Sequence, residues 1–171
     1  RVRLFDRTPS PYLKPNQEMI VGDMMDIEQA VEAAKGASVV YNFAAIADID
    51  EAHDKPIATA TVNVLGSMHA LEAARLVGAR RFIFASSVYV YSESGSFYRA
   101  SKQAAERFTE TYHERYGLEY TILRYGSLYG RRADLRNGIY RMLHEAIQKR
   151  TITYRGSGNA MREYIHVEDA A

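Results

Sequence analysis

Residues 81–102 read RFIFASSVYVYSESGSFYRASK, and this stretch decides the fold class. Its first five residues are mostly apolar and aromatic, which predicts a buried strand over residues 81–85. Helical spacing follows from residue 97 to about residue 115, and Gly117 ends that pattern as a C-cap glycine. A buried strand that leads into a long helix is one βα unit, and repeated βα units build a parallel sheet.

The same alternation continues on both sides of this unit. Asp26 and Gln29 have the spacing of a capping box, and Gly36 and Gly78 mark helix ends. The order of the elements predicts an α/β fold with a doubly wound parallel sheet. Beyond the central unit, we expect strands at residues 1–5, 18–21, 38–43, 119–123 and 151–154, and helices from residue 26 to 35, from 56 to about 77 and from 137 to 149.

The composition is that of an ordinary globular protein. Of 171 residues, 47% are hydrophobic and 25% charged, which excludes the disordered, collagen-like and coiled-coil classes. The formal net charge is only +1, so the basic excess of a nucleic-acid binder is missing. The lack of cysteine excludes a disulfide framework, a thiolate metal site and a cysteine nucleophile. Without a long apolar run or a signal-peptide pattern, we expect a cytoplasmic protein that binds neither membranes nor nucleic acids.

Tyr98 and Lys102 form the first candidate catalytic pair. A spacing of four residues places both side chains on one helix face. There the lysine ammonium would favour the phenolate and lower the tyrosine pKa, which is ordinarily about 10. Such a pair suits a general acid/base that interconverts an alcohol and a ketone. Because the chain has 13 tyrosines, the pair alone is also compatible with a surface lysine beside a half-buried tyrosine.

Ser87 lies where the strand at residues 81–85 gives way to a loop. In a parallel sheet the carboxyl ends of the strands face the ligand crevice, so a hydroxyl at this point can bond a substrate oxygen. A plain turn residue is the alternative for a single serine at a strand end. The case for chemistry therefore depends on Ser87 occurring together with Tyr98 and Lys102.

This combination resembles the extended short-chain dehydrogenase/reductase family, in particular its NAD-dependent nucleotide-sugar epimerases and dehydratases. The resemblance rests on Ser-Ser-x-x-Val-Tyr after a strand and on Tyr-x-x-x-Lys at the start of a helix. It implies a Rossmann-type sheet, NAD as cofactor, a nucleotide-sugar substrate and a homodimer. Further segments resemble family motifs in the same order: Leu4-Phe5-Asp6-Arg7, residues 21–26, Asn42-Phe43-Ala44-Ala45, Asn63, residues 123–130, and residues 156–169.

The resemblance also implies roles for individual residues. Ser87, Tyr98 and Lys102 would be catalytic, and Ser87, Ser127 and Arg162 would contact the substrate. Residues implied to bind the cofactor are Asp6, Arg7, Asp23, Met24, Phe43, Ala44, Ala45, Asn63, Ala85, Tyr98, Lys102 and Tyr125.

Physical arguments support two of these roles independently. A carboxylate at the end of a strand, as at Asp6, accepts both ribose hydroxyls and repels a 2′-phosphate, which favours NAD over NADP. An Asx turn before Pro9 is the alternative for Asp6. Arg162 offers a planar fork for a phosphate, whereas an exposed arginine without a ligand is the alternative. We interpret His166 as a structural residue and assign it no chemistry.

Several positions depart from the family pattern. The glycine-rich turn expected before Arg1 is not in the sequence, and a helix begins at the last residues, so we expect the protein to contain further residues. Ser87 and Tyr98 are eleven positions apart, a shorter connection than in most members, so we expect either a short substrate loop or missing residues around 92–97. Ser127 replaces an asparagine of the family, and Arg131 replaces a proline.

The two residues after Ser87 distinguish between reactions. Dehydratases of the family carry acidic residues there, whereas this chain has Val88 and Tyr89. Because valine cannot move a proton, the sequence favours an epimerase, acting at C4 of a UDP-sugar. A dehydratase or reductase on the same fold is the first alternative, and a non-catalytic NAD-binding protein is the second. We expect an NAD-binding domain at residues 1–130 and the start of a substrate-binding region at residues 131–171.

Overall fold

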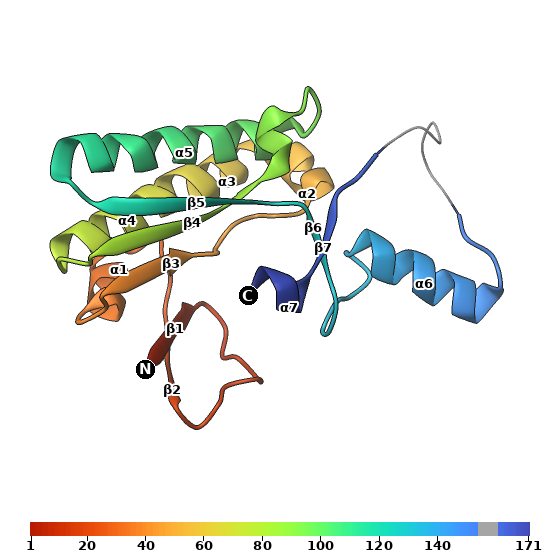
Figure 1. The fold of residues 1–171 in the computed structure, drawn as a ribbon, viewed down its shortest axis with the longest axis horizontal. Helices are drawn as coiled ribbons and strands as arrows, with labels where there is room; N and C mark the ends of the chain where they lie inside the picture. Colours follow the sequence, from red (N-terminus) through yellow and green to blue (C-terminus); the bar gives the residue numbers. More distant parts are fainter. Residues whose placement is uncertain (154–160) are drawn as a thin grey trace. The chain divides into compact units, whose positions relative to one another are not determined.

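The computed structural model describes residues 1–153 and 161–171, shown as a ribbon in Figure 1. Its contacts divide the chain into two compact units, Arg1–Leu123 and Arg124–Ala171. This division by contacts falls at residue 123. The boundary that we expect after Gly130 separates NAD-binding from substrate-binding residues, and it stays a prediction.

The strands of the first unit form two parallel arrangements. β1 (Val2–Asp6) pairs with β2 (Gln17–Val21) in parallel, from Val2 opposite Gln17 to Asp6 opposite Val21. A second sheet has the order β3-β4-β5, in which β3 (Val39–Asn42) is parallel to β4 (Arg81–Ser87) and β5 is Glu119–Tyr125. Parallel strands alternating with helices confirm the predicted α/β fold class.

Within the described ranges, no strand pairing joins the β1–β2 pair to the β3–β4–β5 sheet. In the doubly wound strand order 3-2-1-4-5-6, the first strand lies between the second and the fourth. If the expected first βα unit precedes β1, then β1 is the second strand and β3 the fourth. The break in pairing therefore falls where that order places the first strand.

Local hydrogen bonds explain where the first helix begins and ends. Asp26 Oδ1 accepts from the backbone N–H groups of Glu28 and Gln29 at 3.0 and 3.2 Å, and Gln29 Nε2 returns a bond of 2.8 Å to Asp26 Oδ2. These bonds lower the pKa of the Asp26 carboxyl. Gly36 then adopts φ +74°, which suits a residue without a Cβ. The start predicted for α1 (Ile27–Ala34) is thus confirmed, with Asp26 as N-cap. The reciprocal bond of a capping box is not made, because Asp26 N donates to the Asp23 carbonyl.

The helix expected from residue 56 to about 77 is interrupted. α3 (Pro56–Ala60) leads into a π-helical turn (Thr61–Leu65), and α4 (Gly66–Leu76) follows. A further short helix, α2 (Ile49–Asp54), was missed because six residues carry too little periodicity to be recognised. Asp48 caps α2 by accepting from Glu51 N at 2.9 Å.

The strand expected at residues 151–154 is wrong for its described part. Residues 151–153 have no strand pairing, and residue 154 lies outside the described residues. The backbone N–H and the Oγ1 of Thr153 both donate to the Glu145 carboxylate at 2.9 Å. The segment is therefore tied back to the preceding helix, where its polar groups find partners that a sheet would otherwise supply.

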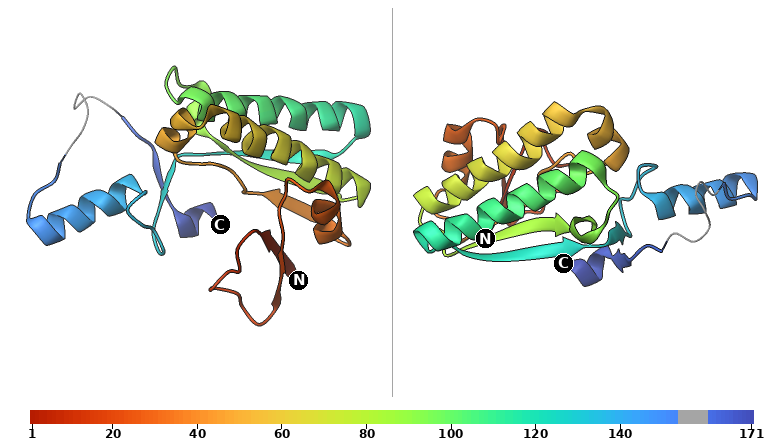
Figure 2. Two further views of the ribbon diagram at one scale, coloured as in Figure 1. Left: turned by 180° about the vertical axis from the view of Figure 1, so that it is seen from behind. Right: turned by 90° about the horizontal axis from the view of Figure 1, so that it is seen from above.

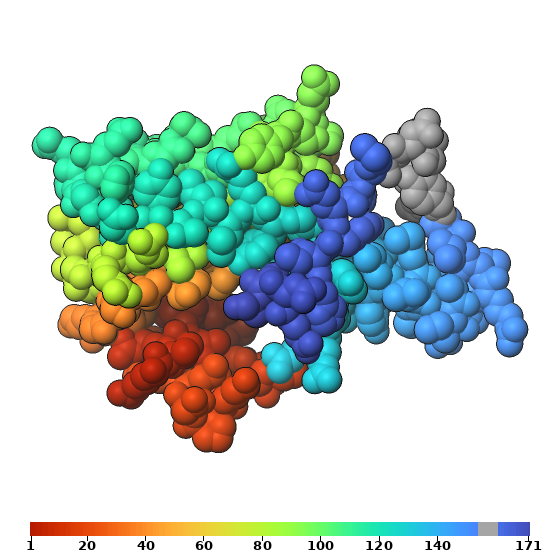
Figure 3. Space-filling model, viewed as in Figure 1, coloured from red at the N-terminus to blue at the C-terminus, as the bar shows by residue number. Residues whose placement is uncertain are grey.

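The core of the first unit lies between the sheet and its helices. Figure 2 shows α4 and α5 (Ser96–Tyr116) side by side over one face of β4. Phe82 and Phe84 lie two residues apart, on the face of β4 that packs against these helices. Both are fully buried, as are Leu71 and Ala105. Burial of each phenylalanine side chain stabilises the folded state by about 1.5–3 kcal/mol relative to leaving it exposed. By contrast, β5 has no buried residue, and its teal atoms lie at the surface in Figure 3.

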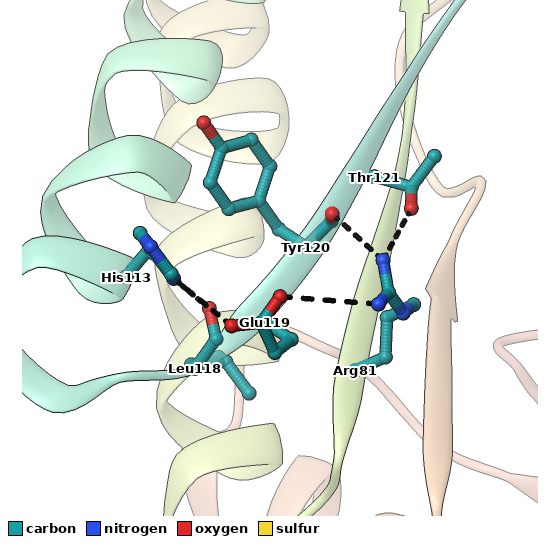
Figure 4. A network of polar contacts seen from close by, with 6 residues as sticks. All are labelled: Arg81, His113, Leu118, Glu119, Tyr120 and Thr121. Atoms are coloured by element: carbon teal, nitrogen blue, oxygen red, sulfur yellow. Dashed lines mark hydrogen bonds and ion pairs between the residues drawn. The ribbon is translucent and has the colours of Figure 1, made fainter.

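A polar network joins the far end of α5 to the starts of β4 and β5 (Figure 4). Arg81 Nη1 donates to the carbonyl of Tyr120 at 3.1 Å and to Thr121 Oγ1 at 3.0 Å. Glu119 lies 3.8 Å from both Arg81 and His113. His113 Nδ1 also lies 3.3 Å from the Leu118 carbonyl, so this end of α5 is held close to the start of β5.

The second unit contains a small parallel sheet and two helices. β6 (Ser127–Tyr129) pairs with β7 (Tyr164–His166), and the helices are α6 (Gly138–Lys149) and α7 (Val167–Ala170). Asn137 caps α6 by accepting from Tyr140 N at 3.1 Å. Across both units, none of the described helices is long and apolar enough to cross a membrane.

Candidate active site

The end of β4 and the first turns of α5 bring together Ser87, Tyr98 and Lys102. All three side chains are buried, at 6%, 8% and 4% exposure. β4 delivers Ser87 at the point where the chain leaves the sheet, and its hydroxyl accepts from Tyr89 N at 3.3 Å. α5 presents Tyr98 and Lys102 one turn apart, as the spacing of four predicts. The geometry therefore groups the three residues that the sequence analysis selected as catalytic.

Lys102 is directed at the backbone of β4. Its Nζ donates to the Ala85 carbonyl at 2.7 Å and lies 4.9 Å from the centroid of the Phe84 ring. The distance from Nζ to the centroid of the Tyr98 ring is 5.8 Å. Burial lowers the pKa of Lys102 from 10.5 to about 8, because the low-dielectric surroundings disfavour the charged form.

The direction of the Tyr98 pKa corrects one expectation. The sequence analysis expected Lys102 to lower it, whereas burial raises it above 10.0. A hydrogen bond with Ser87 opposes this rise, and the charge of Tyr89 adds to it. The expectation was wrong because it counted the neighbouring charge and omitted desolvation, while Lys102 itself is engaged by the Ala85 carbonyl.

A compact loop connects Ser87 to Tyr98. It contains a 3₁₀ turn (Val88–Tyr91) and reaches α5 through Gly95, whose φ is +106°. The loop is tied to α5 by Arg99, which donates to the Ser92 carbonyl, and by Gln103, which donates to the Val90 carbonyl at 2.9 Å. The eleven-position connection thus closes as a short, internally bonded loop.

Tyr89 lies directly beside the central tyrosine. Its ring packs edge-on against Tyr98, with centroids 6.4 Å apart and planes at 80°. A Cβ on Gly95 would come within 3.2 Å of Tyr89 Cδ1, so the missing side chain at Gly95 makes room for this ring. Two residues after Ser87, the chain thus places an aromatic ring beside Tyr98.

Asn63 lies in the π-helical turn and is 1% exposed. Its Oδ1 accepts from Ile46 N at 2.7 Å, while its Nδ2 donates to the Ile46 carbonyl and to Ser101 Oγ, both at 3.0 Å. Ser101 Oγ in turn donates to the Tyr98 carbonyl at 2.8 Å. In this structure the amide therefore holds the segment after β3 against α5, and its implied cofactor role stays a prediction.

The residues implied to bind adenosine lie at the ends of β1 and β2. Asp6 is exposed, and its Oδ1 accepts from Thr8 N at 2.9 Å and from Thr8 Oγ1 at 3.1 Å, so the alternative Asx turn is present. Arg7 follows it and is also exposed. Asp23 Oδ1 accepts from Met25 N at 2.9 Å. The Met24 side chain packs against Gly66, where an added Cβ would lie 2.9 Å from Met24 Cε.

The segment after β3 carries Phe43, Ala44 and Ala45. Phe43 is 61% exposed and stacks on Tyr41 with ring centroids 5.9 Å apart. The Ala44 N–H donates to Asn42 Oδ1 at 3.2 Å, which turns the chain away from the strand. Ala45 is partly buried. The implied contacts of this segment with a cofactor stay predictions.

The remaining implied site residues belong to the second unit. Tyr125 and Ser127 are half-buried, Arg162 is exposed, and Ser127 N donates to the Glu163 carbonyl at 2.7 Å. His166 Nδ1 caps α7 by accepting from Glu168 N at 3.3 Å, which agrees with its structural interpretation. The motif at residues 156–158 lies outside the described residues.

One buried contact at this site was missed by the sequence analysis. Ser86 Oγ donates to Glu106 Oε1 at 2.6 Å, and the two residues are 4% and 3% exposed. The spacing of Tyr98, Lys102 and Glu106 by four residues along one helix face is the signal that could have shown it.

Three comparisons give this site its context. The model of the NAD dependent epimerase/dehydratase family matches residues 1–171. A putative UDP-glucose 4-epimerase of Methanocaldococcus jannaschii is 28% identical over 178 residues, covering 93% of this chain and 58% of that protein. Among solved structures, the UDP-glucose 4-epimerase of Thermotoga maritima with UDP-glucose is similar with a TM-score of 0.87 and 25% identity, over 98% of this chain and 62% of that one.

Similarity extends to a second kind of enzyme. A dTDP-glucose 4,6-dehydratase from Streptomyces venezuelae, solved with NAD bound, is similar with a TM-score of 0.83 and 25% identity, over 91% of this chain and 52% of that one. The chain thus spans between 52% and 62% of the lengths of these three relatives.

Proposed function

The chain belongs to the NAD-dependent epimerase/dehydratase family, and on that premise we propose that the full-length protein inverts C4 of a UDP-sugar through a transient 4-keto intermediate. Membership confirms the resemblance to extended short-chain dehydrogenases/reductases and, with it, NAD as the cofactor of the family. The observation that carries the proposal is the convergence of Ser87, Tyr98 and Lys102 next to a residue pair, Val88 and Tyr89, that has no carboxylate.

The residues present fit NAD at two places. Asp6 ends β1 as an exposed carboxylate, the group that suits ribose hydroxyls. Lys102 uses one of the three donors of its ammonium on the Ala85 carbonyl, and Tyr98 lies one turn before it on α5. When bound, NAD accepts a hydride and returns it, so the overall reaction is redox-neutral.

Tyr98 has the central role in the proposed reaction. Once ionised, its Oη takes the proton of the sugar hydroxyl when the carbon is oxidised and returns that proton when the carbon is reduced. Because burial raises the pKa of Tyr98, this ionisation depends on positive charge beside the phenol. Ser87 bonds the same sugar oxygen and keeps it aligned. Lys102 holds positive charge beside Tyr98, and because its pKa is about 8 it remains an ammonium at pH 7.

The residues after Ser87 favour epimerisation over dehydration. Elimination of water requires a second acid/base, and Val88 has no ionisable group. Tyr89 packs edge-on against Tyr98 and replaces an acidic residue. Similarity to a dTDP-glucose 4,6-dehydratase keeps a dehydratase as the second candidate, which would leave a keto product.

The test is to incubate full-length protein with a panel of nucleotide sugars and to follow the products by NMR. We expect inversion of one carbon without net formation or loss of NADH. A 4-keto-6-deoxy product would establish the dehydratase instead, and net consumption of reduced cofactor would establish a reductase.

The Tyr98→Phe variant is the matched control for this test. It removes only the hydroxyl that moves the proton, so we expect kcat to fall by about 10²–10⁴-fold while NAD still binds. Unchanged turnover in Tyr98→Phe would contradict the proposed role. NAD binding without turnover in the wild-type protein would support the non-catalytic alternative.

We also propose a homodimer that forms through α3, α4 and α5. Apolar side chains on these elements are exposed in the single chain, among them Ile57 at 79%, Leu76 at 52% and Phe97 at 46%. Light scattering of the full-length protein during gel filtration tests this, and a monomeric mass at micromolar concentration would contradict it.

A further inference from the structure

Two of the last residues of β4 are bonded to α5. The Ala85 carbonyl accepts from Lys102 Nζ at 2.7 Å, and Ser86 Oγ donates to Glu106 Oε1 at 2.6 Å. The next residue, Ser87, lowers the pKa of Tyr98 through its side chain. Ala85 and Ser86 are thus matched to α5 side chains at positions 102 and 106, and Ser87 acts on position 98.

These strand residues have no backbone pairing with β3. β3 pairs with β4 only from Val39–Arg81 to Asn42–Phe84, so Ala85, Ser86 and Ser87 extend beyond the end of β3. The chain then leaves the sheet in the 3₁₀ turn. On the β3 side, no backbone ladder therefore holds this strand end, and the side-chain bonds to α5 add to the pairing of β4 with β5 on its other edge.

Glu106 is the member of this set without a place in the proposed reaction. It is 3% exposed. Burial of a carboxylate is costly unless hydrogen bonds satisfy it. The short bond from Ser86 is one such hydrogen bond, and it ties Ser86 to a fixed position on α5.

We propose that Glu106 is a positioning residue: by holding Ser86, it sets the register in which Ala85 presents its carbonyl to Lys102 and Ser87 presents its hydroxyl to Tyr98. The inference rests on the proposed function. A displacement of about 1 Å at a reacting group can cost around 100-fold in rate, so a contact of this kind has a large effect without touching the substrate.

The pH dependence of turnover reports on the position of Ser87. The bond from Ser87 lowers the pKa of Tyr98, whereas burial raises it. If the strand end shifts and this bond is lost, the pKa of Tyr98 rises further. Since Tyr98 acts as phenolate, the acidic limb of the kcat profile then moves to higher pH. Lys102 and Tyr89 are the other titratable groups packed around Tyr98, and neither is replaced in the variants below.

The kinetic test compares variants of the full-length protein. Glu106→Leu and Ser86→Ala each remove the bond, and we expect kcat to fall roughly 10- to 100-fold with little change in KM. Glu106→Gln keeps an acceptor oxygen for Ser86 and should restore kcat to within about threefold of wild type. The double variant Glu106→Leu/Ser86→Ala should be no slower than the slower single variant, because both act through one contact.

Thr109→Val is the matched control on the same helix. Thr109 is 1% exposed and donates only within α5, to the Ala105 carbonyl at 2.8 Å. We expect this variant to lower the melting temperature without moving the pH profile. An equal loss of kcat in Glu106→Gln and Glu106→Leu, additive losses in the double variant, or an unmoved acidic limb would each overturn the inference.

A second measurement works without turnover. In full-length protein labelled with ¹³Cζ-tyrosine, the Tyr98 resonance is assigned with Tyr98→Phe and titrated by NMR. We expect a higher Tyr98 pKa in Glu106→Leu and Ser86→Ala than in wild type, and the wild-type value in Thr109→Val. An unchanged Tyr98 pKa in Ser86→Ala, which loses a single hydroxyl and should fold, overturns the inference. If wild-type protein turns over no nucleotide sugar, the proposed function fails, while this titration still judges Glu106 separately.

Discussion

Tyr98 and Lys102 are two ionisable side chains of the candidate site that are buried, and burial disfavours the charged form of each. Burial raises the pKa of Tyr98 and lowers the pKa of Lys102 to about 8. Both shifts favour the neutral form of each group. The pKa of Lys102 thereby moves toward neutral pH, whereas that of Tyr98 moves away from it. Perturbed pKa values in adjacent groups are typical of functional sites. The Ala85 carbonyl and the Ser87 hydroxyl partly compensate for the lost hydration.

Replacement of Lys102 measures the free energy that burial of its ammonium group costs the folded state. Below about pH 8, Lys102 is charged in both states, and the folded state bears the desolvation penalty. Between pH 8 and 10.5 the unfolded chain binds more protons than the folded protein, so the wild type gains stability as pH rises. We therefore expect Lys102→Met to be more stable than wild type at pH 7 by about 1–2 kcal/mol, after allowance for the lost bond to Ala85.

Urea unfolding of both proteins at pH 7 and at pH 10 measures this difference. The advantage of Lys102→Met should shrink at the higher pH, because the wild-type lysine is then neutral in the folded state. An advantage that grows with pH would show that the lysine is stabilising as a charge.

At the scale of elements, α5 is held to the sheet at both ends. Arg81, Glu119 and His113 join its C-terminal end to β4 and β5 (Figure 4). Bonds to Ala85 and Ser86 join its N-terminal half to the end of β4. A helix anchored in this way keeps its side chains in fixed positions, which is what a general acid/base requires.

The turn into α5 provides an element-scale prediction. Gly95 has φ +106°, and an added Cβ would lie 3.1 Å from Arg99 Cβ and 3.2 Å from Tyr89 Cδ1. We expect Gly95→Ala to destabilise the protein by about 1–3 kcal/mol, through both backbone strain and contact. Gly36→Ala is the control, since Gly36 also has positive φ but no atom within 4 Å of its added Cβ. Equal losses of unfolding free energy in the two variants would mean that contact at Gly95 is unimportant.

The π-helical turn provides a second prediction at the scale of elements. Asn63→Ala leaves the N–H and C=O of Ile46 and the Ser101 hydroxyl without their amide partner. We expect a loss of about 1–3 kcal/mol in unfolding free energy. Hydrogen exchange of the Ile46 amide should accelerate more than that of amides in β1. Uniform acceleration throughout the first unit would instead indicate a global effect.

At the scale of the whole molecule, the described chain covers part of the length of its relatives. It spans 58% of a putative UDP-glucose 4-epimerase and 62% of a solved one. Its NAD-binding residues, as proposed, come from β1 and β2 as well as from α5. Cofactor binding is therefore a property to be measured on the full-length protein.

Discrimination between cofactors is the prediction at this scale. The exposed carboxylate of Asp6 repels a 2′-phosphate, so NAD should raise the melting temperature of full-length protein more than NADP at equal concentration. A ligand at about 100 times its Kd stabilises by ~2.7 kcal/mol, which thermal unfolding detects easily. Asp6→Asn should reduce the difference between the two cofactors, and an unchanged preference in that variant would remove Asp6 from the site.

Local signals made several elements predictable. The N-cap Asp26, its bond with Gln29 and the C-cap Gly117 act through bonds between near neighbours in the chain. The spacing of four that places Tyr98 and Lys102 together is likewise a property of one helix. For the same reason the short α2 and the π-helical turn were missed, because neither carries a periodic signal of its own.

By itself, the sequence determined the α/β alternation of the first unit, several helix ends and the pairing of Tyr98 with Lys102 on one helix face, since these follow from spacing and local hydrogen bonds. The grouping of Ser87 with that pair came from the family resemblance. Only the tertiary structure decided that Lys102 donates to Ala85, that Glu106 accepts from Ser86, and that burial raises the pKa of Tyr98. The physical reason is that contacts between residues 17 to 20 positions apart depend on how α5 packs on β4. Desolvation likewise depends on every element that covers a group, which no local pattern encodes.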